Sequence, residues 1–87
     1  MTTLHSQYYV YVVRCSDDTY YTGKTHDLEH RIKQHNGLLV GGAKYTSNRR
    51  PVTLVYQEVF SNNKDACARE EAIKQLTRKE KQFLIAS

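Results

Sequence analysis

The sequence has no long hydrophobic run, and this absence excludes a membrane-spanning helix. The longest apolar stretch, residues 8–13, is six residues, whereas about 20 are needed to cross a bilayer. Residues 1–7 contain neither a basic segment nor an apolar one, so they do not resemble a secretion signal. With 87 residues in all, we expect a flexible N-terminus at 1–7 and one domain at 8–87.

Cysteine is also scarce. Cys15 and Cys67 lie far apart in the sequence and form no CxxC pair. Without a secretion signal, we expect two free, buried thiols in a reducing cytoplasm rather than a disulfide. Internal repeats and low-complexity tracts are absent as well.

Positive charge is present in excess. Lys and Arg number 13 and Asp and Glu number 9, which gives a net charge of +4 and favours a polyanionic partner. Six basic residues form two groups, one of Lys44, Arg49 and Arg50 and one of Arg78, Lys79 and Lys81. We interpret these groups as a nucleic-acid-binding surface with salt-dependent affinity; the alternative is two solvated faces.

The residue pattern predicts an α+β domain in the order β-β-α-β-α-α around a three-stranded sheet. The expected strands are residues 8–15, 19–24 and 52–60, which are rich in aromatic and β-branched side chains. The first expected helix runs from an N-cap at Thr25 to Asn36-Gly37. The second covers 64–76, with Asn62 and Asn63 as candidate caps, and the third begins at a capping box at 77–80. The sequence is also compatible with a short helical turn at 43–47. The last helix should carry Phe83, Leu84 and Ile85 into the core.

The register of the first hairpin stays open at this level. The turn residues Ser16, Asp17 and Asp18 allow a loop of three residues, which would pair Tyr11 with Gly23. Tyr11 and Tyr21 would then share one face of the sheet. A four-residue loop would place the two tyrosines on opposite faces.

Two helix faces carry candidate chemistry. Arg31 and His35 fall on the inward face of the first helix with two aliphatic residues, where an arginine fork suits a phosphate. The alternative is a snorkelling arginine and a half-buried histidine. His26 and His30 fit a zinc-peptidase pattern, H-x-x-E-H, but they face away from the apolar side, so we set this interpretation aside.

Glu70 lies at the edge of the buried face of its helix, whose apolar centre is Ala66, Ile73 and Leu76. Glu71 points nearly the opposite way, toward solvent. A carboxylate in the position of Glu70 needs a partner. That partner is either a basic side chain in an ion pair or a divalent metal such as Mg²⁺ or Mn²⁺.

Together these motifs resemble the GIY-YIG nuclease superfamily, in particular its small, stand-alone, single-domain branch. Tyr9-Val10-Tyr11 and Tyr21-Thr22-Gly23 look like the GIY and YIG elements, and residues 42–46 extend the match. Tyr9 replaces a glycine of the family pattern and Thr22 an isoleucine. An asparagine late in the family pattern has no clear counterpart.

The resemblance implies an antiparallel three-stranded sheet flanked by helices and metal-dependent cleavage of phosphodiester bonds. The residues that match the family's catalytic positions are Tyr11, Tyr21, Arg31, His35 and Glu70, with Glu70 as the ligand of one Mg²⁺ or Mn²⁺ ion. We expect a structure-selective DNA endonuclease of the cytoplasm that acts in DNA repair or processing. A protein partner for targeting is left open.

The chemical hypothesis is attack by a water molecule that is deprotonated through Tyr11, whose pKa the metal and Arg31 would lower. Arg31 would stabilise the pentacovalent phosphate, while Tyr21 and His35 would position water or phosphate. Two alternatives remain from other classes. One is a catalytically silent nucleic-acid-binding module, and the other is a protein-interaction domain.

Overall fold

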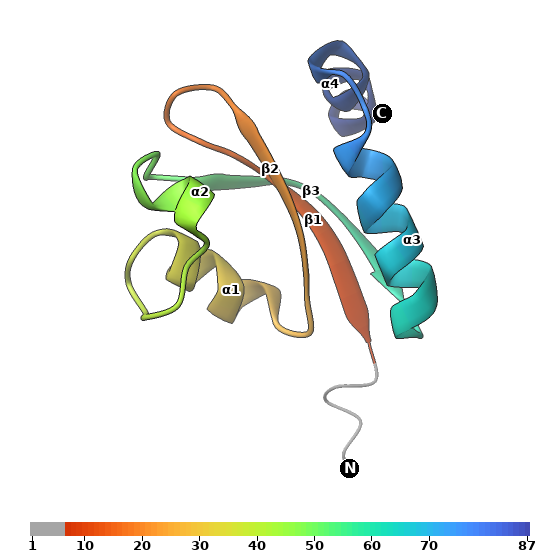
Figure 1. The fold of residues 1–87 in the computed structure, drawn as a ribbon, viewed down its shortest axis with the longest axis horizontal. Helices are drawn as coiled ribbons and strands as arrows, with labels where there is room; N and C mark the ends of the chain where they lie inside the picture. The colour runs from red at the N-terminus through yellow and green to blue at the C-terminus, as the bar shows by residue number, and fades with distance from the viewer. Residues whose placement is uncertain (1–6) are drawn as a thin grey trace.

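A three-stranded antiparallel sheet lies between two pairs of helices in the computed structural model, which describes residues 7–87 (Figure 1). The elements in chain order are β1 (Tyr8–Arg14), β2 (Tyr20–Thr25), α1 (Leu28–His35), α2 (Lys44–Ser47), β3 (Thr53–Phe60), α3 (Asn63–Lys74) and α4 (Arg78–Ala86). The predicted α+β fold is confirmed. The flexible segment predicted for 1–7 falls, except for Gln7, outside the described residues.

Strand β1 is the centre of the sheet, in the order β2-β1-β3, and its side chains alternate between two cores. Val10 and Val12 pack with Ala66 and Ile73 on the α3 side. The other face of the strand forms a second cluster, with these members: Tyr11, Val13, Cys15 and Val52. Both faces of β1 are therefore covered by apolar contacts, as the near-continuous apolar run of this strand requires.

The β1–β2 loop has three residues, which resolves the alternative left open by the sequence. The Cys15 N–H donates to the Thr19 carbonyl at 2.8 Å. Asp18 has a φ of 66°, in the left-handed region that aspartate tolerates better than most residues. Tyr11 consequently pairs with Gly23, and Tyr11 and Tyr21 lie on the same face of the sheet.

Helix α1 begins later than the sequence predicted. Its N-cap is Asp27, whose side chain accepts from the His30 N–H at 3.1 Å, and the predicted cap at Thr25 is wrong. The reason is that β2 continues to Thr25, which pairs with Tyr9. The predicted end is confirmed, because Gly37 follows the helix with a φ of 79°.

Asn36 joins the end of α1 to the start of β3. Its Nδ2 donates to the Val52 carbonyl at 3.1 Å, and its Oδ1 accepts from the Val52 N–H at 2.6 Å. The side chain therefore satisfies both backbone groups of Val52, a buried residue. This contact fixes the C-terminal end of α1 against the sheet.

Helices α3 and α4 have the caps that the sequence predicted. Asn62 accepts from the Asp65 N–H at 2.8 Å, and Thr77 and Glu80 form a reciprocal capping box. The prediction that Phe83 enters the core is wrong, since its exposed fraction is 81%. Leu84 and Ile85 do pack on the α3-side core, and Phe83 points elsewhere because successive residues turn by about 100°.

Both cysteines are free, as predicted, but only Cys15 is buried. Cys67 is exposed because its neighbour Ala66 takes the inward position on α3. Within residues 7–87, no helix is both long and apolar enough to cross a membrane.

Candidate active site

Side chains from three elements meet on the α1 side of the sheet. Tyr11 of β1 and Tyr21 of β2 both lie against the ring of His35 of α1, with centroid distances of 5.7 Å and 5.2 Å. Tyr11 and His35 have no exposed surface, whereas Tyr21 is half-buried. The three-residue hairpin loop is what allows this cluster, since it places both tyrosines on one face.

A chain of hydrogen bonds fixes the tautomer of His35. The Thr46 hydroxyl donates its single proton to the Ala43 carbonyl at 3.0 Å, so it accepts from His35 Nδ1 at 2.9 Å. In the neutral ring Nε2 is then unprotonated and accepts from the Tyr11 hydroxyl at 2.6 Å. The geometry therefore assigns the Tyr11 proton to the bond with His35.

Burial shifts both pKa values of this pair. It lowers the pKa of His35 to about 4, with further contributions from the charges of Arg31 and Arg50. It raises the pKa of Tyr11 to about 12, although Arg31 acts in the opposite direction. Arg31 thus has the effect expected from the sequence, but burial outweighs it, and the pair is neutral near pH 7.

Gly23 makes room for the Tyr11 side chain on the neighbouring strand. A Cβ atom at Gly23 would lie at 2.4 Å from the Tyr11 hydroxyl oxygen and at 2.6 Å from Cζ. Both distances are far below van der Waals contact. Any side chain at this position would displace the phenol ring, so the glycine of the YIG-like element has a steric role here.

Arg31 connects this cluster to the loop that follows α1. Its Nη1 donates to Gln34 Oε1 at 2.9 Å and to the Gly41 carbonyl at 2.8 Å. The side chain is half-buried and interacts with the Tyr11 hydroxyl. Because both of these bonds use Nη1, contact with a phosphate would fall to Nε and Nη2.

Glu70 comes from α3, on the other face of the sheet, and its side chain is 19% exposed. Lys74 Nζ lies at 3.1 Å from Glu70 Oε2, and this contact raises the pKa of Lys74. The ion pair considered as an alternative at the sequence level is therefore present. Glu71 is exposed, as predicted, whereas the Glu70 charge acts on Tyr11.

Glu70 is also the only predicted metal ligand, and residues 7–87 contain no group of three or more His, Cys, Asp or Glu side chains placed to hold a metal. A single carboxylate is nevertheless compatible with Mg²⁺, which keeps several waters and completes its shell with substrate phosphates. Glu70 fits such an ion once the Lys74 ammonium moves away from the Glu70 carboxylate. The described part of the chain places no zinc-type cluster at His26 and His30.

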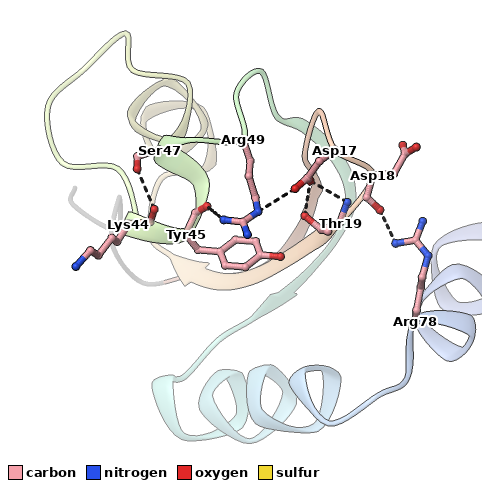
Figure 2. Close-up of polar contacts among 8 residues, drawn as sticks. All are labelled: Asp17, Asp18, Thr19, Lys44, Tyr45, Ser47, Arg49 and Arg78. Atoms are coloured by element: carbon pink, nitrogen blue, oxygen red, sulfur yellow. Dashed lines mark hydrogen bonds and ion pairs between the residues drawn. The ribbon is translucent and has the colours of Figure 1, made fainter.

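The first predicted basic group lies next to the tyrosines. Tyr45 stacks on Tyr21 with a centroid distance of 5.8 Å, and the Arg49 guanidinium lies 4.0 Å from the Tyr45 ring centre. Arg49 also binds Asp17 Oδ2 at 3.0 Å and the Tyr45 carbonyl at 2.8 Å (Figure 2). Lys44 is exposed and points away from these contacts in Figure 2.

The second basic group reaches the same hairpin turn from α4. Arg78 donates to the Asp18 carbonyl (Figure 2) and lies 5.1 Å from the Tyr20 ring centre. Lys79 is exposed and Lys81 is half-buried. Arg78, like Arg49, therefore supports the β1–β2 turn. The sequence did not predict this structural role for either arginine.

The remaining basic residue, Arg50, donates from Nε to the His35 carbonyl at 2.8 Å. It lies beside the catalytic candidates but contacts the backbone of α1. The structure thus brings Tyr11, Tyr21, Arg31 and His35 together, while the six basic residues are spread over two regions.

Sequence reasoning missed the parts played by Thr46 and Gln34. Thr46 is buried and completes the His35 hydrogen bonds; its only signal was its place in the segment 42–46 of the resemblance. Gln34 has no signal in the sequence, because its two contacts are with Arg31 and with the Val40 carbonyl at 3.0 Å, and both depend on the loop conformation.

Comparisons with known proteins agree with this geometry. The family model described as the GIY-YIG catalytic domain matches residues 7–83. The chain is 53% identical over 79 residues to a UPF0213 protein of Clostridium perfringens, covering 91% of this chain and 83% of that protein.

Solved structures are similar as well. The solution NMR structure of a UPF0213 protein from Bacillus halodurans matches with a TM-score of 0.60 and 39% identity, covering 92% of this chain and 83% of that chain. A second solution NMR structure, of a protein from E. faecalis, matches with a TM-score of 0.61 and 42% identity, over 90% and 82% of the two chains.

Proposed function

Because this chain belongs to the GIY-YIG family, we propose that it is an endonuclease that hydrolyses phosphodiester bonds in DNA. The observation that carries the proposal is the buried contact between the Tyr11 hydroxyl and His35 Nε2 at 2.6 Å, next to the half-buried Arg31. A purely structural core has little need of an arginine, a histidine and two tyrosines in one cluster.

In the proposed reaction Arg31 binds the scissile phosphate through Nε and Nη2, whose planar arrangement matches two phosphate oxygens. The Tyr11 hydroxyl has no exposed surface. Arg31 must therefore move from the hydroxyl toward the phosphate, which opens a path for a water molecule. The same positive charge then stabilises the pentacovalent phosphate.

Tyr11 takes a proton from the attacking water while its own proton passes to His35 Nε2. The imidazolium that forms keeps its Nδ1–H bond to Thr46. A bound phosphate offsets the charges of Arg31 and Arg50, which contribute to the low pKa of His35, so substrate binding favours this transfer. His35 acts through Tyr11, because His35 itself is buried. The proposed role of Tyr21 is to position water or phosphate.

A divalent ion, Mg²⁺ or Mn²⁺, would bind to Glu70 and would supply neutralisation of charge on the phosphate and the leaving oxygen. The proposed location is the cytoplasm, where two free thiols persist. Nothing in the cluster reads a base edge, so we propose selection by DNA structure and a role in DNA repair or processing.

The test is cleavage of end-labelled branched, flapped and continuous duplex DNA with Mg²⁺, with Mn²⁺ and with a chelator. We expect nicking that requires the metal and that Glu70→Gln abolishes. Glu71→Gln is the matched control, because Glu71 is the exposed neighbour on the same helix, and it should cleave normally.

Equal cleavage by the Glu70→Gln variant would show that Glu70 does not take part and would contradict the proposal. Binding of DNA without cleavage under every metal condition would favour the catalytically silent module. The Glu70–Lys74 ion pair is the observation that favours that second function, since it already gives Glu70 a partner.

A further inference from the structure

The loop between α1 and α2 exposes three consecutive apolar side chains. The exposed fractions are 72% for Leu38, 38% for Leu39 and 96% for Val40. Three exposed apolar residues in a row are unfavourable in water unless they serve a contact. The loop therefore needs an explanation that the fold does not supply.

This loop is held in place at both ends by bonds to α1. The N–H groups of Leu38 and Leu39 donate to the Lys33 carbonyl at 2.9 Å and 3.4 Å. On the other side, Gln34 Nε2 donates to the Val40 carbonyl at 3.0 Å, and Arg31 Nη1 donates to the Gly41 carbonyl at 2.8 Å. The apolar side chains are thus presented on a fixed backbone, which lowers the entropy lost on binding.

The same bonds place the loop beside the proposed phosphate site. Arg31 is the proposed phosphate ligand, and it also donates a hydrogen bond to the carbonyl of Gly41. A Cβ at Gly42 would lie 2.3 Å from the Gln34 carbonyl oxygen, so the loop returns directly over α1. Whatever the loop contacts will lie next to a phosphate bound by Arg31.

Basic side chains lie around the loop. Lys33 lies at its start and Lys44 just after its end, and Arg50 Nη1 would be 2.7 Å from a Cβ at Gly37. Cations around an apolar tip complement a nucleic acid, in which phosphates flank stacked bases. These three cations are the reason to prefer a nucleic acid to a protein as the partner.

One side of the loop is less suited to DNA. Leu39 borders a groove of about 220 Å³ that also contains Asp27 and Glu29, and Glu29 pairs with Lys33 at 3.7 Å. Leu38 and Val40 are the more exposed residues and are not part of that groove.

We propose that Leu38 and Val40 form an apolar wedge that inserts between bases where the stacking of DNA is interrupted. This inference rests on the proposed function and names its substrate class: nicks, flaps and branches rather than continuous duplex. Unstacking an intact step has a free-energy cost, and that cost is absent where the stack is already broken.

The experiment measures binding in a chelator, so that no cleavage is expected, with 2-aminopurine placed at the branch or nick. The unmodified protein should bind branched DNA more tightly than continuous duplex of the same sequence, and 2-aminopurine fluorescence should rise as the base unstacks. The Leu38→Ser/Val40→Ser variant should lose roughly tenfold in affinity for branched DNA. It should also lose the fluorescence change, with continuous-duplex binding unaltered.

Val59→Ser is the matched control, because Val59 is an exposed valine on β3, and it should behave like the unmodified protein. Unchanged affinity and fluorescence in the loop variant would overturn the wedge while leaving the nuclease proposal standing. A change of molecular mass in light scattering with unchanged DNA binding would assign the loop to a protein contact and would also overturn it. A protein that binds none of these DNAs would contradict the proposed function itself.

Discussion

His35 is uncharged and fully buried between two tyrosine rings, and this environment links protonation to folding. In the unfolded chain a histidine has a pKa near 6.5, whereas burial lowers the pKa of His35 to about 4 in the folded protein. Between these values the unfolded state binds more protons than the folded state. Stability is therefore complete above pH 6.5 and decreases as the pH falls toward 4.

We expect the free energy of unfolding to fall by up to about 1.4 kcal/mol per pH unit in this window. Urea denaturation at several values between pH 7.5 and 5 measures it. Asp17 and Glu58 have lowered pKa values, so their contributions are lost at more acidic pH. His35→Gln should flatten the profile and His30→Gln, at an exposed site, should not; equal slopes in both variants would contradict this assignment.

The sequence predicted the inward positions of Arg31 and His35 because helix periodicity is local. It did not predict that His35 would be buried uncharged, since that state depends on Tyr11 and Thr46, from β1 and α2. The sequence also did not predict that the pKa of Tyr11 is raised. Burial raises it and outweighs the neighbouring charge of Arg31, and burial depends on the whole fold.

At the scale of elements, the packing of β2 against α3 contains one unfavourable group. Thr22 is 3% exposed, and its Oγ1 has no hydrogen-bond partner among the described residues. It pairs with Val12 and so faces the α3-side core. A buried hydroxyl without a partner costs about 1–3 kcal/mol.

We expect Thr22→Val to stabilise the protein, by roughly 1 kcal/mol, because valine has nearly the same shape and removes the hydroxyl. Thermal or urea unfolding of the variant measures the gain. Thr53→Val is the control, since Thr53 is exposed at the start of β3, and it should change stability little. A destabilised Thr22→Val variant would mean that the hydroxyl has a partner that matters to the fold.

The elements themselves followed largely from the sequence, because caps and periodicity are local features. Asn62, Thr77 and Glu80 cap their helices as predicted. The failures occurred where a neighbouring element extended or a helix face was misjudged. Strand β2 continues to Thr25 and displaces the cap to Asp27, and Phe83 lies off the inward face of α4.

At the scale of the whole molecule, which has a net charge of +4, some basic residues make structural contacts and others are exposed to solvent. Arg49 and Arg78 are used to support the β1–β2 turn (Figure 2). Lys44 and Lys79 are exposed and are available to phosphates. The two basic groups therefore contain arginines with structural contacts as well as exposed lysines.

We expect Lys79→Ala to lower the slope of log affinity for duplex DNA against log salt by about 0.9, the value for one lost phosphate contact. Lys64→Ala removes the same charge from α3, outside both basic groups, and should leave the slope nearly unchanged. Binding titrations from about 50 to about 200 mM salt would show the difference. Equal slopes for the two variants would mean that net charge alone governs binding.

The sequence by itself determined the order of strands and helices, the inward faces of α1 and α3, and the residues that resemble a GIY-YIG site, because these depend on spacing along a short stretch of chain. Only the tertiary structure decided that Tyr11 and Tyr21 share a face and that Thr46 fixes the tautomer of His35. The first depends on hairpin register, where a one-residue change reverses the facing of a strand. The second depends on side chains of β1, α1 and α2 that meet only after the helices pack on the sheet.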